Sequence, residues 1–261
     1  MRIAVVGASG RMGRAIVRLA ENEGIDVVCA VGASDIGRDV GELAGIGAIG
    51  TPVVDGLGAL EAVRADVVVD FSAPGATRAL APIAATAGSA IVSGTTGLDE
   101  PALAALDAAA ASVPVFWEPN TSAGVHVLGE IVEQAARALA DWDIEIVEMH
   151  HHGKADAPSG TALRLAERAA DARSPAAMRL VHGRSGRPGA RSPSEIGMHA
   201  LRGGDVVGEH IVYLAGGGER IELAHRATSR DVFAHGALRA VRWIAGRPAG
   251  RYSMRDVLAG R

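Results

Sequence analysis

The chain has 261 residues, of which 48% are hydrophobic, and it carries a formal net charge of −4 at pH 7. This apolar content excludes a disordered chain, the small negative charge excludes a nucleic-acid binder held by phosphate contacts, and the length suits one large domain or two modest ones. The single cysteine, Cys29, excludes an internal disulfide framework and a multi-thiolate metal site. Because no apolar run matches a membrane span or a signal peptide, we expect a cytoplasmic enzyme or binding protein without a membrane or nucleic-acid partner.

The first half of the chain alternates short β-branched runs with longer alanine-rich segments. This alternation is typical of βαβ units, whose right-handed crossovers build a doubly wound parallel sheet. The expected strands are 3–6, 27–31, 67–71, 90–93 and 113–117, and the expected helices begin near Gly10, Pro74 and Pro101. We therefore predict a Rossmann-like α/β domain in this part of the chain.

A glycine-rich turn, Gly7-Ala8-Ser9-Gly10-Arg11-Met12-Gly13, joins the first expected strand to the first expected helix. Glycines permit a tight turn, and backbone N–H groups at a helix N-terminus attract a pyrophosphate. A purely structural turn is the alternative in a chain with 34 glycines. The position after the first strand favours a dinucleotide-binding site instead.

The cofactor preference depends on the end of the second expected strand, where an acid favours NAD and a nearby arginine favours NADP. This strand ends in Val31-Gly32-Ala33-Ser34-Asp35, and Arg38 follows. Because Asp35 is displaced by a few residues from the usual position of the acid, both NADH and NADPH stay open.

After Asn120 the pattern changes to that of an α+β domain whose sheet is at least partly antiparallel. An amphipathic helix is predicted from one apolar stripe, formed by Leu128, Ile131, Val132, Ala135 and Leu139. The other expected elements are an alternating strand from Ile144 to a histidine cluster, a helix over 161–172, a mobile loop over 182–193, strands over 205–214 and 220–227 joined by a glycine hairpin, and a last helix over 232–244.

The segment 148–162 concentrates three histidines and the only lysine of the chain at a strand-to-helix connection. Histidine can deliver or take a proton near neutral pH, and lysine can hold a carboxylate or donate a proton. Ser159 is expected to cap a helix whose first N–H groups, on Gly160 and Thr161, bind an anion. These features together predict a small substrate with two carboxylates and a reaction step that needs a proton.

Two other interpretations of this segment stay open. The histidines can be ordinary solvated surface, or they can bind a metal ion together with Glu148 and Asp156. A lysine among the ligands would repel a cation, which disfavours the metal. Lys154 also stands out in the composition, because the other 25 of the 26 basic residues are arginine. A guanidinium stays protonated, so a single lysine marks a place where an ammonium able to lose its proton is needed.

The same segment closely resembles the signature of the dihydrodipicolinate reductase family, the 4-hydroxy-tetrahydrodipicolinate reductases of lysine and diaminopimelate synthesis. The similarity extends over essentially the whole chain. Its further motifs are Gly10-Arg11-Met12-Gly13, Gly94-Thr95-Thr96-Gly97, Pro119-Asn120-Thr121-Ser122, His199-Ala200-Leu201-Arg202-Gly203-Gly204-Asp205 and Ser229-Arg230-Asp231-Val232-Phe233.

This resemblance implies a homotetrameric cytoplasmic enzyme that reduces 4-hydroxy-tetrahydrodipicolinate to tetrahydrodipicolinate with NADH or NADPH. It implies a discontinuous dinucleotide-binding domain, 1–121 and 229–261, and a substrate-binding and tetramerisation domain, 122–228. The implied catalytic residues are His150, as general acid or base, and Lys154, as proton donor and carboxylate contact. The implied substrate contacts are His151, Gly160 and Thr161. The implied cofactor contacts are Gly7, Ala8, Ser9, Gly10, Arg11, Met12, Gly94, Thr95, Thr96, Glu118, Pro119, Asn120 and Thr121, and no metal site is implied.

The chain departs from the family pattern where Gly32-Ala33 replaces an acidic or basic pair, and His152 and Gly153 match variable positions. A different two-domain reductase, of the amino-acid-semialdehyde or homoserine type, would lack the run of histidines. A non-catalytic dinucleotide-sensing regulator would keep the glycine turn but would have no reason to assemble His150, Lys154 and the anion-binding helix start.

Overall fold

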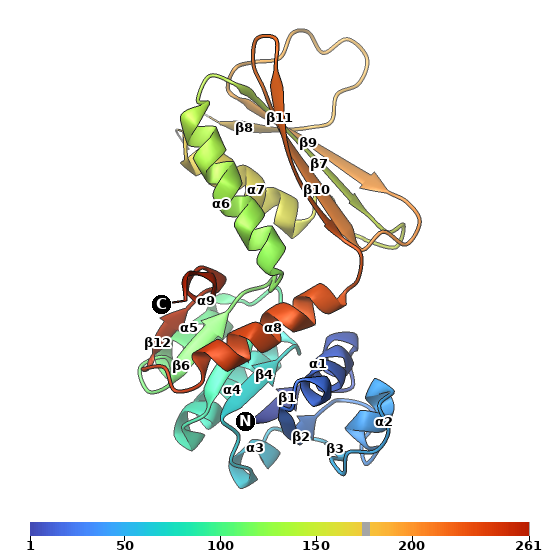
Figure 1. Ribbon diagram of the computed structural model, residues 1–261, viewed down its shortest axis with the longest axis vertical. Coiled ribbons are helices and arrows are strands. Elements are labelled where there is room, and N and C mark those ends of the chain that lie inside the picture. Colours follow the sequence, from blue (N-terminus) through green and yellow to red (C-terminus); the bar gives the residue numbers. More distant parts are fainter. Residues whose placement is uncertain (174–177, 261) are drawn as a thin grey trace. The chain divides into compact units, whose positions relative to one another are not determined.

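The computed structural model describes residues 1–173 and 178–260 and divides into two compact units (Figure 1). Unit 1 comprises Met1–Ala123 and Asp231–Arg261, and unit 2 comprises Gly124–Arg230. The chain thus leaves unit 1 once and returns to it. The binding roles expected for the two parts of the chain remain predictions.

Unit 1 is built on a parallel seven-stranded sheet with the order β12-β6-β5-β4-β1-β2-β3. Its strands are β1 (Arg2–Val6), β2 (Asp26–Val31), β3 (Val53–Val54), β4 (Val67–Asp70), β5 (Ala90–Ser93), β6 (Pro114–Trp117) and β12 (Gly250–Tyr252). Its helices are α1 (Arg11–Asn22), α2 (Val40–Ala44), α3 (Ala59–Ala62), α4 (Pro74–Ala87), α5 (Glu100–Ala109), α8 (Asp231–Ile244) and α9 (Met254–Ala259). The chain switches direction across the sheet between β1 and β4, and such switch points are where doubly wound folds bind ligands.

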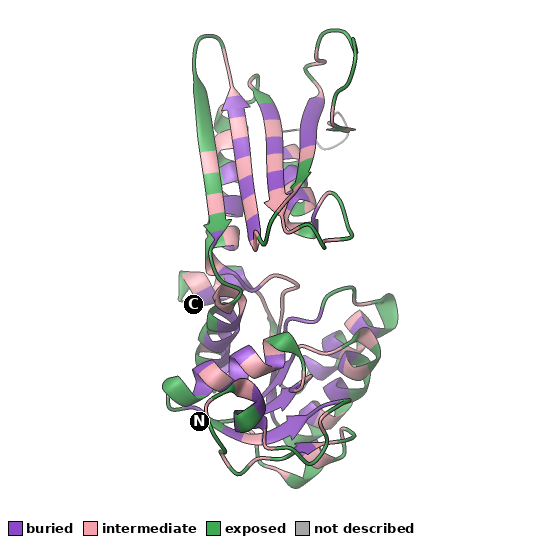
Figure 2. Ribbon diagram, turned by 90° about the vertical axis from the view of Figure 1, so that its right-hand side faces the viewer, coloured by how far each residue is buried: buried purple, intermediate pink, exposed green. Residues whose placement is uncertain are grey.

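Both faces of this sheet are covered, which explains why its central strands are apolar along most of their length. Ile3 and Val5 of β1 face one core layer, together with α1, α2, α8 and α9, and Ala4 and Val6 face the other layer, together with α3, α4 and α5. Figure 2 shows these strands buried along most of their length. The predicted doubly wound fold is confirmed, with β3 and β12 as additional strands of two and three residues.

Unit 2 contains a mixed five-stranded sheet with the order β11-β10-β7-β9-β8. Its elements are α6 (Ala123–Ala138), β7 (Asp143–His150), α7 (Gly160–Asp171), β8 (Arg179–His182), β9 (Glu195–Arg202), β10 (Gly208–Ala215) and β11 (Arg220–Ala227). β7, β9 and β8 run parallel, whereas β10 is antiparallel to β7 and β11. Ile144, Ile146 and Val212 pack with α6 and α7 in one core, so one face of the sheet carries the helices. The alternating burial along β7 and β10 is visible in Figure 2.

Three expectations for unit 2 need correction. Strands β8 and β9 were not predicted as separate elements, and the strand expected from residue 205 begins only at Gly208. The apolar stripe of α6 also differs, because Ile131 is 43% exposed while Leu128 and Val132 are buried. Within the described residues, no helix is both long and apolar enough to cross a membrane.

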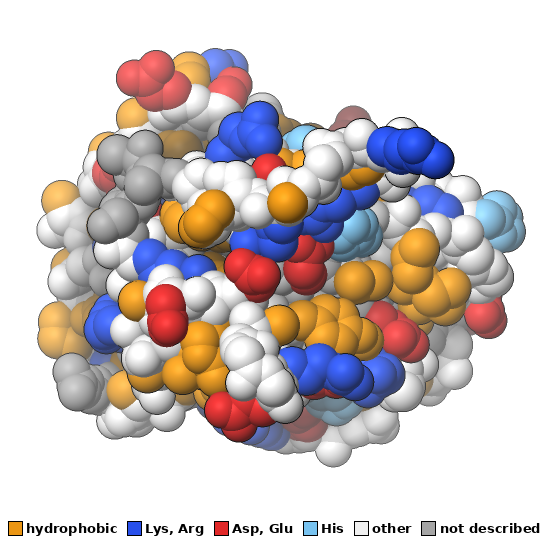
Figure 3. Space-filling view, turned by 90° about the horizontal axis from the view of Figure 1, so that it is seen from above, with side chains coloured by type: hydrophobic (Ala, Val, Ile, Leu, Met, Phe, Trp, Pro, Cys, Tyr) orange, Lys and Arg blue, Asp and Glu red, His pale blue; other side chains and the backbone are white. Residues whose placement is uncertain are grey.

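The loop expected over 182–193 begins one residue later, because His182 ends β8, and two of its arginines, Arg184 and Arg191, form ion pairs. Arg184 donates both of its terminal nitrogens to Glu145 at 2.8 and 2.9 Å, and Arg191 donates to Glu145 and Asp143. These contacts and a hydrogen bond to His199 lower the pKa of Glu145 to about 2, against the raising effect of burial. Basic and acidic side chains lie beside one another in the space-filling view of Figure 3.

Candidate functional site

The turn between β1 and α1 has the geometry of an anion-binding cradle. Gly7 has a φ of +82°, and a Cβ there would collide with the backbone of Phe71. A Cβ at Gly13 would collide with the carbonyl oxygen of Gly7 and with Ala8. Gly10 is the N-cap of α1 and provides no side-chain cap. The helix N-terminus therefore directs backbone N–H groups at a surface that no side chain of the cap covers, which suits a pyrophosphate.

A cavity of about 470 Å³ lies beside this turn within unit 1. It is lined by Val6, Gly7, Ser9, Gly10, Val31, Gly32, Ala33, Ser34, Asp55, Gly56, Leu57, Phe71, Ser72, Ala73 and Ala76. Of the cofactor contacts expected in the turn, Gly7, Ser9 and Gly10 line the cavity, Ala8 is buried, Met12 is half-buried and Arg11 is exposed. The glycine cradle and the adjoining cavity fit a dinucleotide in this position.

The loop after β2 explains why the sequence left the cofactor preference open. Asp35 adopts a φ of +59° and accepts from Arg14 and Arg38, each at 3.1 Å. The hydroxyl of Ser9 donates to the backbone oxygen of Ser34 at 2.6 Å, which ties the glycine turn to this loop. One acidic and two basic side chains are thus joined at the place where NAD and NADP are normally distinguished.

A fully buried carboxylate, that of Asp70, supports the turn that follows β5. Its oxygens accept hydrogen bonds from Thr77 Oγ1 at 2.6 Å, Ser93 Oγ at 2.8 Å and Thr95 Oγ1 at 2.9 Å, and also from the hydroxyl of Ser72. We call these five residues the Asp70 cage. The sequence analysis missed it, although Asp70 ends a central strand, where polar side chains usually serve a binding site.

The predicted cofactor contacts Gly94, Thr95 and Thr96 form the turn that the Asp70 cage supports. A Cβ at Gly94 would collide with the ring of Phe71, and the side chain of Thr95 is buried in the cage. Thr96 is the exposed residue of the three. The segment 118–121 also combines accessible and buried residues. Glu118, Pro119 and Asn120 are half-buried, whereas Thr121 is buried. The hydroxyl of Thr121 donates to the carbonyl oxygen of Phe233 at 2.6 Å.

In unit 2, a second fully buried carboxylate lies at the end of β7. Glu148 accepts from Nη1 and Nη2 of Arg202 at 2.9 and 2.8 Å and from the backbone N–H of Ser159 at 3.0 Å, and its Oε2 lies 2.5 Å from Nδ1 of His150. His210 packs edge-on against the ring of His150, with centroids 5.3 Å apart. We call Glu148, His150, Ser159, Arg202 and His210 the Glu148 cluster.

The protonation of the Glu148 cluster follows from its burial and its hydrogen bonds. Burial alone would raise the pKa of Glu148, but the bonds from Arg202, His150 and the Ser159 N–H outweigh it and lower this pKa. Burial, followed by the charge of His150, lowers the pKa of His210 to about 4. Near neutral pH the cluster therefore holds an ionised Glu148 and an uncharged His210.

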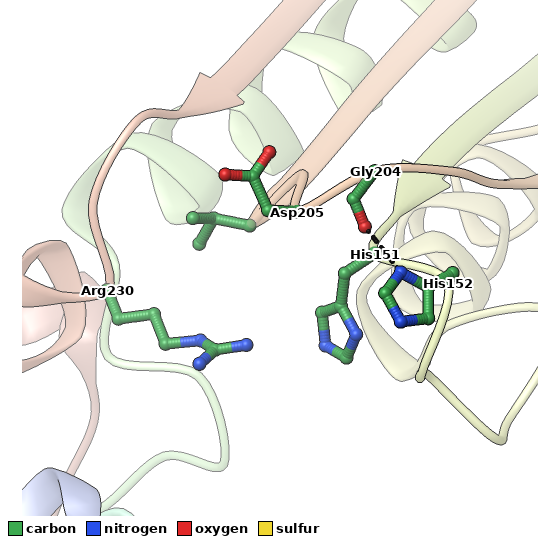
Figure 4. A pocket seen from close by; sticks show the side chains of 6 residues that line it. His151, His152, Gly204, Asp205 and Arg230 are labelled. Atoms are coloured by element: carbon green, nitrogen blue, oxygen red, sulfur yellow. Dashed lines mark hydrogen bonds between the residues drawn. The ribbon is translucent and has the colours of Figure 1, made fainter.

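His151 lies outside this cluster, on a cavity of about 570 Å³ within unit 2. The cavity is lined by His151, His152, Gly204, Asp205, Val207 and Arg230, and Figure 4 shows the side chains of Arg230 and His151 facing each other across it. Nδ1 of His152 lies 3.0 Å from the carbonyl oxygen of Gly204. Loss of solvent contact, followed by the charge of Arg230, lowers the pKa of His151. The cavity therefore offers the cation of Arg230 and the imidazole of His151 to an anion, while His152 and the carboxylate of Asp205 lie on the same lining.

Lys154 and the start of α7 complete the set of predicted residues. Nζ of Lys154 lies 2.7 Å from Asp156, which lowers the pKa of Asp156. The predicted cap is confirmed, because Ser159 Oγ accepts from the N–H of Ala162 at 3.2 Å. A Cβ at Gly160 would meet nothing within 4 Å, and its φ is not left-handed. Neither packing nor strain therefore requires a glycine at this position.

The structure thus joins His150 and Ser159 through Glu148 and places His151 on a cavity with Arg230, while Lys154 pairs with Asp156. Arg202, Arg230 and His210 were not predicted as site residues. Two of them stand inside quoted motifs, Arg202 in the 199–205 motif and Arg230 in the 229–233 motif, so a signal for them was present. Among the described residues, no group of three or more histidine, cysteine, aspartate or glutamate side chains is arranged to hold a metal ion.

Unit 1 has the Rossmann-type fold. A structure of GenD2 from gentamicin A biosynthesis, in complex with NAD, matches with a TM-score of 0.62 at 16% identity and covers 100% of this chain and 90% of that one. A parallel sheet with a glycine turn after β1 and a second unit with a mixed sheet are the architecture of a two-unit dinucleotide-binding protein.

The sequence comparisons define the family. The models for the N-terminus and the C-terminus of dihydrodipicolinate reductase match residues 1–121 and 124–258. The chain belongs to this family. A 4-hydroxy-tetrahydrodipicolinate reductase of Alkalilimnicola ehrlichii is 52% identical and that of Anaeromyxobacter sp. is 53% identical, each over at least 97% of both chains. A dipicolinate-bound dihydrodipicolinate reductase from Paenisporosarcina sp. TG-14 matches with a TM-score of 0.79 at 25% identity and 97% coverage of both chains.

Proposed function

We propose that this enzyme reduces 4-hydroxy-tetrahydrodipicolinate to tetrahydrodipicolinate with NADH or NADPH, in the synthesis of diaminopimelate and lysine. Family membership supports the reaction. The observation that carries the site is the junction of β7 and α7, where Glu148 binds both His150 and the backbone N–H of the helix cap. A proton-transfer group and an anion-binding helix start are thereby linked through one carboxylate.

The residues of unit 2 would bind the substrate through its two carboxylates. The N–H groups of Gly160 and Thr161, at the start of α7, would bind one carboxylate. Arg230 and His151 line one cavity and would bind the other. Such charge-assisted hydrogen bonds are stronger than neutral ones and fix the ring in one orientation.

The chemical balance assigns one proton to the protein. The nicotinamide supplies a hydride to the ring when it is bound, one proton is taken up, and the 4-hydroxyl group leaves as water. Negative charge develops on the ring nitrogen as hydride arrives, and a positioned acid relieves it. His150 is the proposed acid, and Lys154 is proposed to donate a proton and to contact a carboxylate.

In unit 1 the proposed cofactor contacts are the glycine turn, the Gly94–Thr96 turn and the segment 118–121. The cradle that a Cβ would fill at Gly7 supports a pyrophosphate there. Thr95 and Thr121 would contribute through the backbone, because their hydroxyl groups are used inside unit 1.

We further propose a cytoplasmic homotetramer held together by unit 2. The sheet face opposite α6 and α7 carries Glu145, Val147 and Met149 of β7 in alternation with the core residues. Leu201 is 49% exposed on the same face. An open sheet face with exposed apolar side chains suits burial against other copies. Light scattering coupled to size-exclusion chromatography measures the mass, and a monomer at micromolar concentration would contradict this assembly.

The reaction is tested by mixing the protein with NADH or NADPH and freshly generated substrate, and following the absorbance of the reduced cofactor. We expect oxidation that depends on both protein and substrate. His150→Asn should lower kcat by about 100-fold, as expected for loss of a general acid. His182→Asn, on exposed β8, is the matched control. No oxidation with either cofactor would overturn the proposed function.

A further inference from the structure

We propose that Glu148 is the positioning residue of His150: it fixes the imidazole as the Nδ1–H tautomer and thereby reserves Nε2 for proton exchange with the substrate. This inference rests on the proposed function for its consequence, but its structural part can be measured without substrate. In this proposal the carboxylate of Glu148 orients His150 in addition to pairing with Arg202.

The hydrogen-bond pattern of Glu148 leaves one assignment for the shared proton. Each carboxylate oxygen accepts two bonds: Oε1 from Arg202 and the Ser159 N–H, and Oε2 from Arg202 and Nδ1 of His150. The cation of Arg202 and the hydrogen bonds from His150 and the Ser159 N–H favour the ionised form of this carboxylate. An ionised carboxylate can only accept, so the proton in the 2.5 Å contact belongs to Nδ1 of His150.

Two further contacts confine the ring of His150. The His210 ring meets it edge-on at an interplanar angle of 76°. On the other side, a Cβ at Gly208 would lie only 2.9 Å from Nε2. Gly208 is the first residue of β10. Any other residue at this position would place a Cβ so close to Nε2 that the imidazole ring would have to move. The imidazole is therefore held at Nδ1 by a hydrogen bond, and the missing side chain of Gly208 leaves space beside Nε2.

The carboxylate also couples the proton-transfer group to the anion-binding group. Ser159 is the N-cap of α7, and its backbone N–H is held by the same carboxylate that holds His150. Its hydroxyl lies 3.0 Å from Nε2 of His210. A change at Glu148 therefore reaches both the ring of His150 and the start of α7, whereas a change at Gly208 reaches only the Nε2 side.

The tautomer is measured by ¹⁵N chemical shifts of the histidine side chains, with His150 assigned from the signals that His150→Asn removes. In the wild-type protein at pH 8 we expect a pyrrole-type Nδ1 and a pyridine-type Nε2 for His150. The reverse pattern in the wild-type protein would overturn the proposal without any variant. A failure to reduce the proposed substrate would leave this spectrum unchanged, so the two failures are distinguishable.

Glu148→Gln tests the cause. The amide keeps the size of the side chain but can donate as well as accept, so we expect the Nε2–H tautomer to become populated and kcat to fall about 100-fold, with a smaller change in KM. Glu148→Asp keeps the charge and should retain the Nδ1–H tautomer with part of the turnover. Unchanged ¹⁵N shifts in a folded Glu148→Gln protein would contradict the proposal.

Glu145→Gln is the matched control. Glu145 lies on the same strand, also contacts a histidine, His199 at 2.7 Å, and also pairs with arginines, but it points to the opposite sheet face. We expect the His150 signals to stay in place in this variant. Gly208→Ala should lower kcat while the Nδ1–H tautomer persists, and a loss of that tautomer there would show that the ring is positioned by packing and not by the carboxylate.

Discussion

Each unit of the molecule buries one carboxylate completely at the end of a central strand, and the two carboxylates are stabilised in different ways. Asp70 of unit 1 accepts from four hydroxyl groups, those of Ser72, Thr77, Ser93 and Thr95. Glu148 of unit 2 accepts from the guanidinium of Arg202, the imidazole of His150 and one backbone N–H. The first set contains no titratable donor, and the second contains a histidine and a permanent cation.

This difference separates a scaffold from a proton-handling site. Four uncharged hydroxyl groups hold the Asp70 cage together, which suits the turn that is proposed to contact the cofactor through its backbone. A carboxylate between an arginine and a histidine instead fixes where a proton lies and responds to acid. We therefore expect three kinds of change to affect the two units unequally. Removal of either carboxylate and a fall in pH should change the stability of the units by different amounts, and substitutions in the site of unit 2 should change turnover.

The largest effect is expected from removing the carboxylates themselves. Glu148→Ala leaves the half-buried Arg202 guanidinium without its partner, and breaking such a pair costs about 4 kcal/mol of the free energy of unfolding. Asp70→Ala leaves small hydroxyl groups that can rotate to other acceptors, so we expect a loss of about 2 kcal/mol.

The two units can be followed separately in the full chain by tryptophan fluorescence during urea unfolding. Trp142 lies in unit 2, and Trp117 and Trp243 lie in unit 1. Trp142→Phe therefore reports unit 1, and the double variant Trp117→Phe/Trp243→Phe reports unit 2. A larger loss for Asp70→Ala than for Glu148→Ala would break the proposed contrast.

Acid should weaken unit 2 before unit 1. Burial lowers the pKa of His210 to about 4 in the folded state, where this residue is only 4% exposed. As the pH falls below its usual value of 6.5, the unfolded chain binds a proton that the folded chain does not, so stability is lost between pH 6.5 and 4. The shift corresponds to about 3 kcal/mol at most.

The lowered pKa of Glu148 acts in a different window. It contributes stability that is present above the usual 4.5 and is lost only as the pH falls below that value. His225, whose pKa burial also lowers, adds to the effect of His210 with the same sign. His210→Gln should remove most of the slope of unit 2 stability between pH 6.5 and 4.5. Unit 1, whose one histidine, His235, is 57% exposed, is the internal control, and an equal slope there would contradict the assignment.

A smaller effect is expected at Lys154, where unit 2 uses a lysine and every other basic position of the chain is arginine. Lys154→Arg keeps the charge and can keep the ion pair with Asp156. A guanidinium does not release a proton and is larger and planar, so we expect kcat to fall about 30-fold with unchanged unfolding. Arg220→Lys, at an exposed ion pair of β11, is the control for the exchange itself, and normal turnover of Lys154→Arg would refute the argument from composition.

The strands of unit 1 were easier to predict from the sequence than those of unit 2, and the reasons are physical. The strands of unit 1 are apolar because both faces are covered, so they stand out as runs, and five of its seven strands were predicted. β9 was missed because Gly197, His199 and Ala200 break any apolar pattern in it. Its neighbour is β7, which is distant in sequence, so pairing and not local preference makes it a strand.

The candidate site shows the same limit. His150, His151, Lys154 and the Ser159 cap were found because they lie in one continuous segment. Arg202 and His210 reach Glu148 only through pairing of β9 and β10 with β7, across 54 and 62 residues of chain. The roles of Glu148 and Asp70 depend on partners that a linear pattern does not place. Glu148 was therefore considered only as a possible metal ligand, and Asp70 was missed.

The smallest expected effect concerns two glycines, one in each unit, that differ in the space around them. Gly13 of unit 1 is required by the fold, because a Cβ there would collide with the backbone of Gly7 and Ala8. Gly160 of unit 2 has open space where its Cβ would be. Gly160→Ala should therefore leave the free energy of unfolding unchanged and raise the substrate KM about 10-fold, since a methyl group would stand between a carboxylate and the first N–H groups of α7. Gly13→Ala should instead destabilise unit 1. If Gly160→Ala bound substrate normally, the start of α7 would be a helix cap alone and the second carboxylate would have to be bound elsewhere in unit 2.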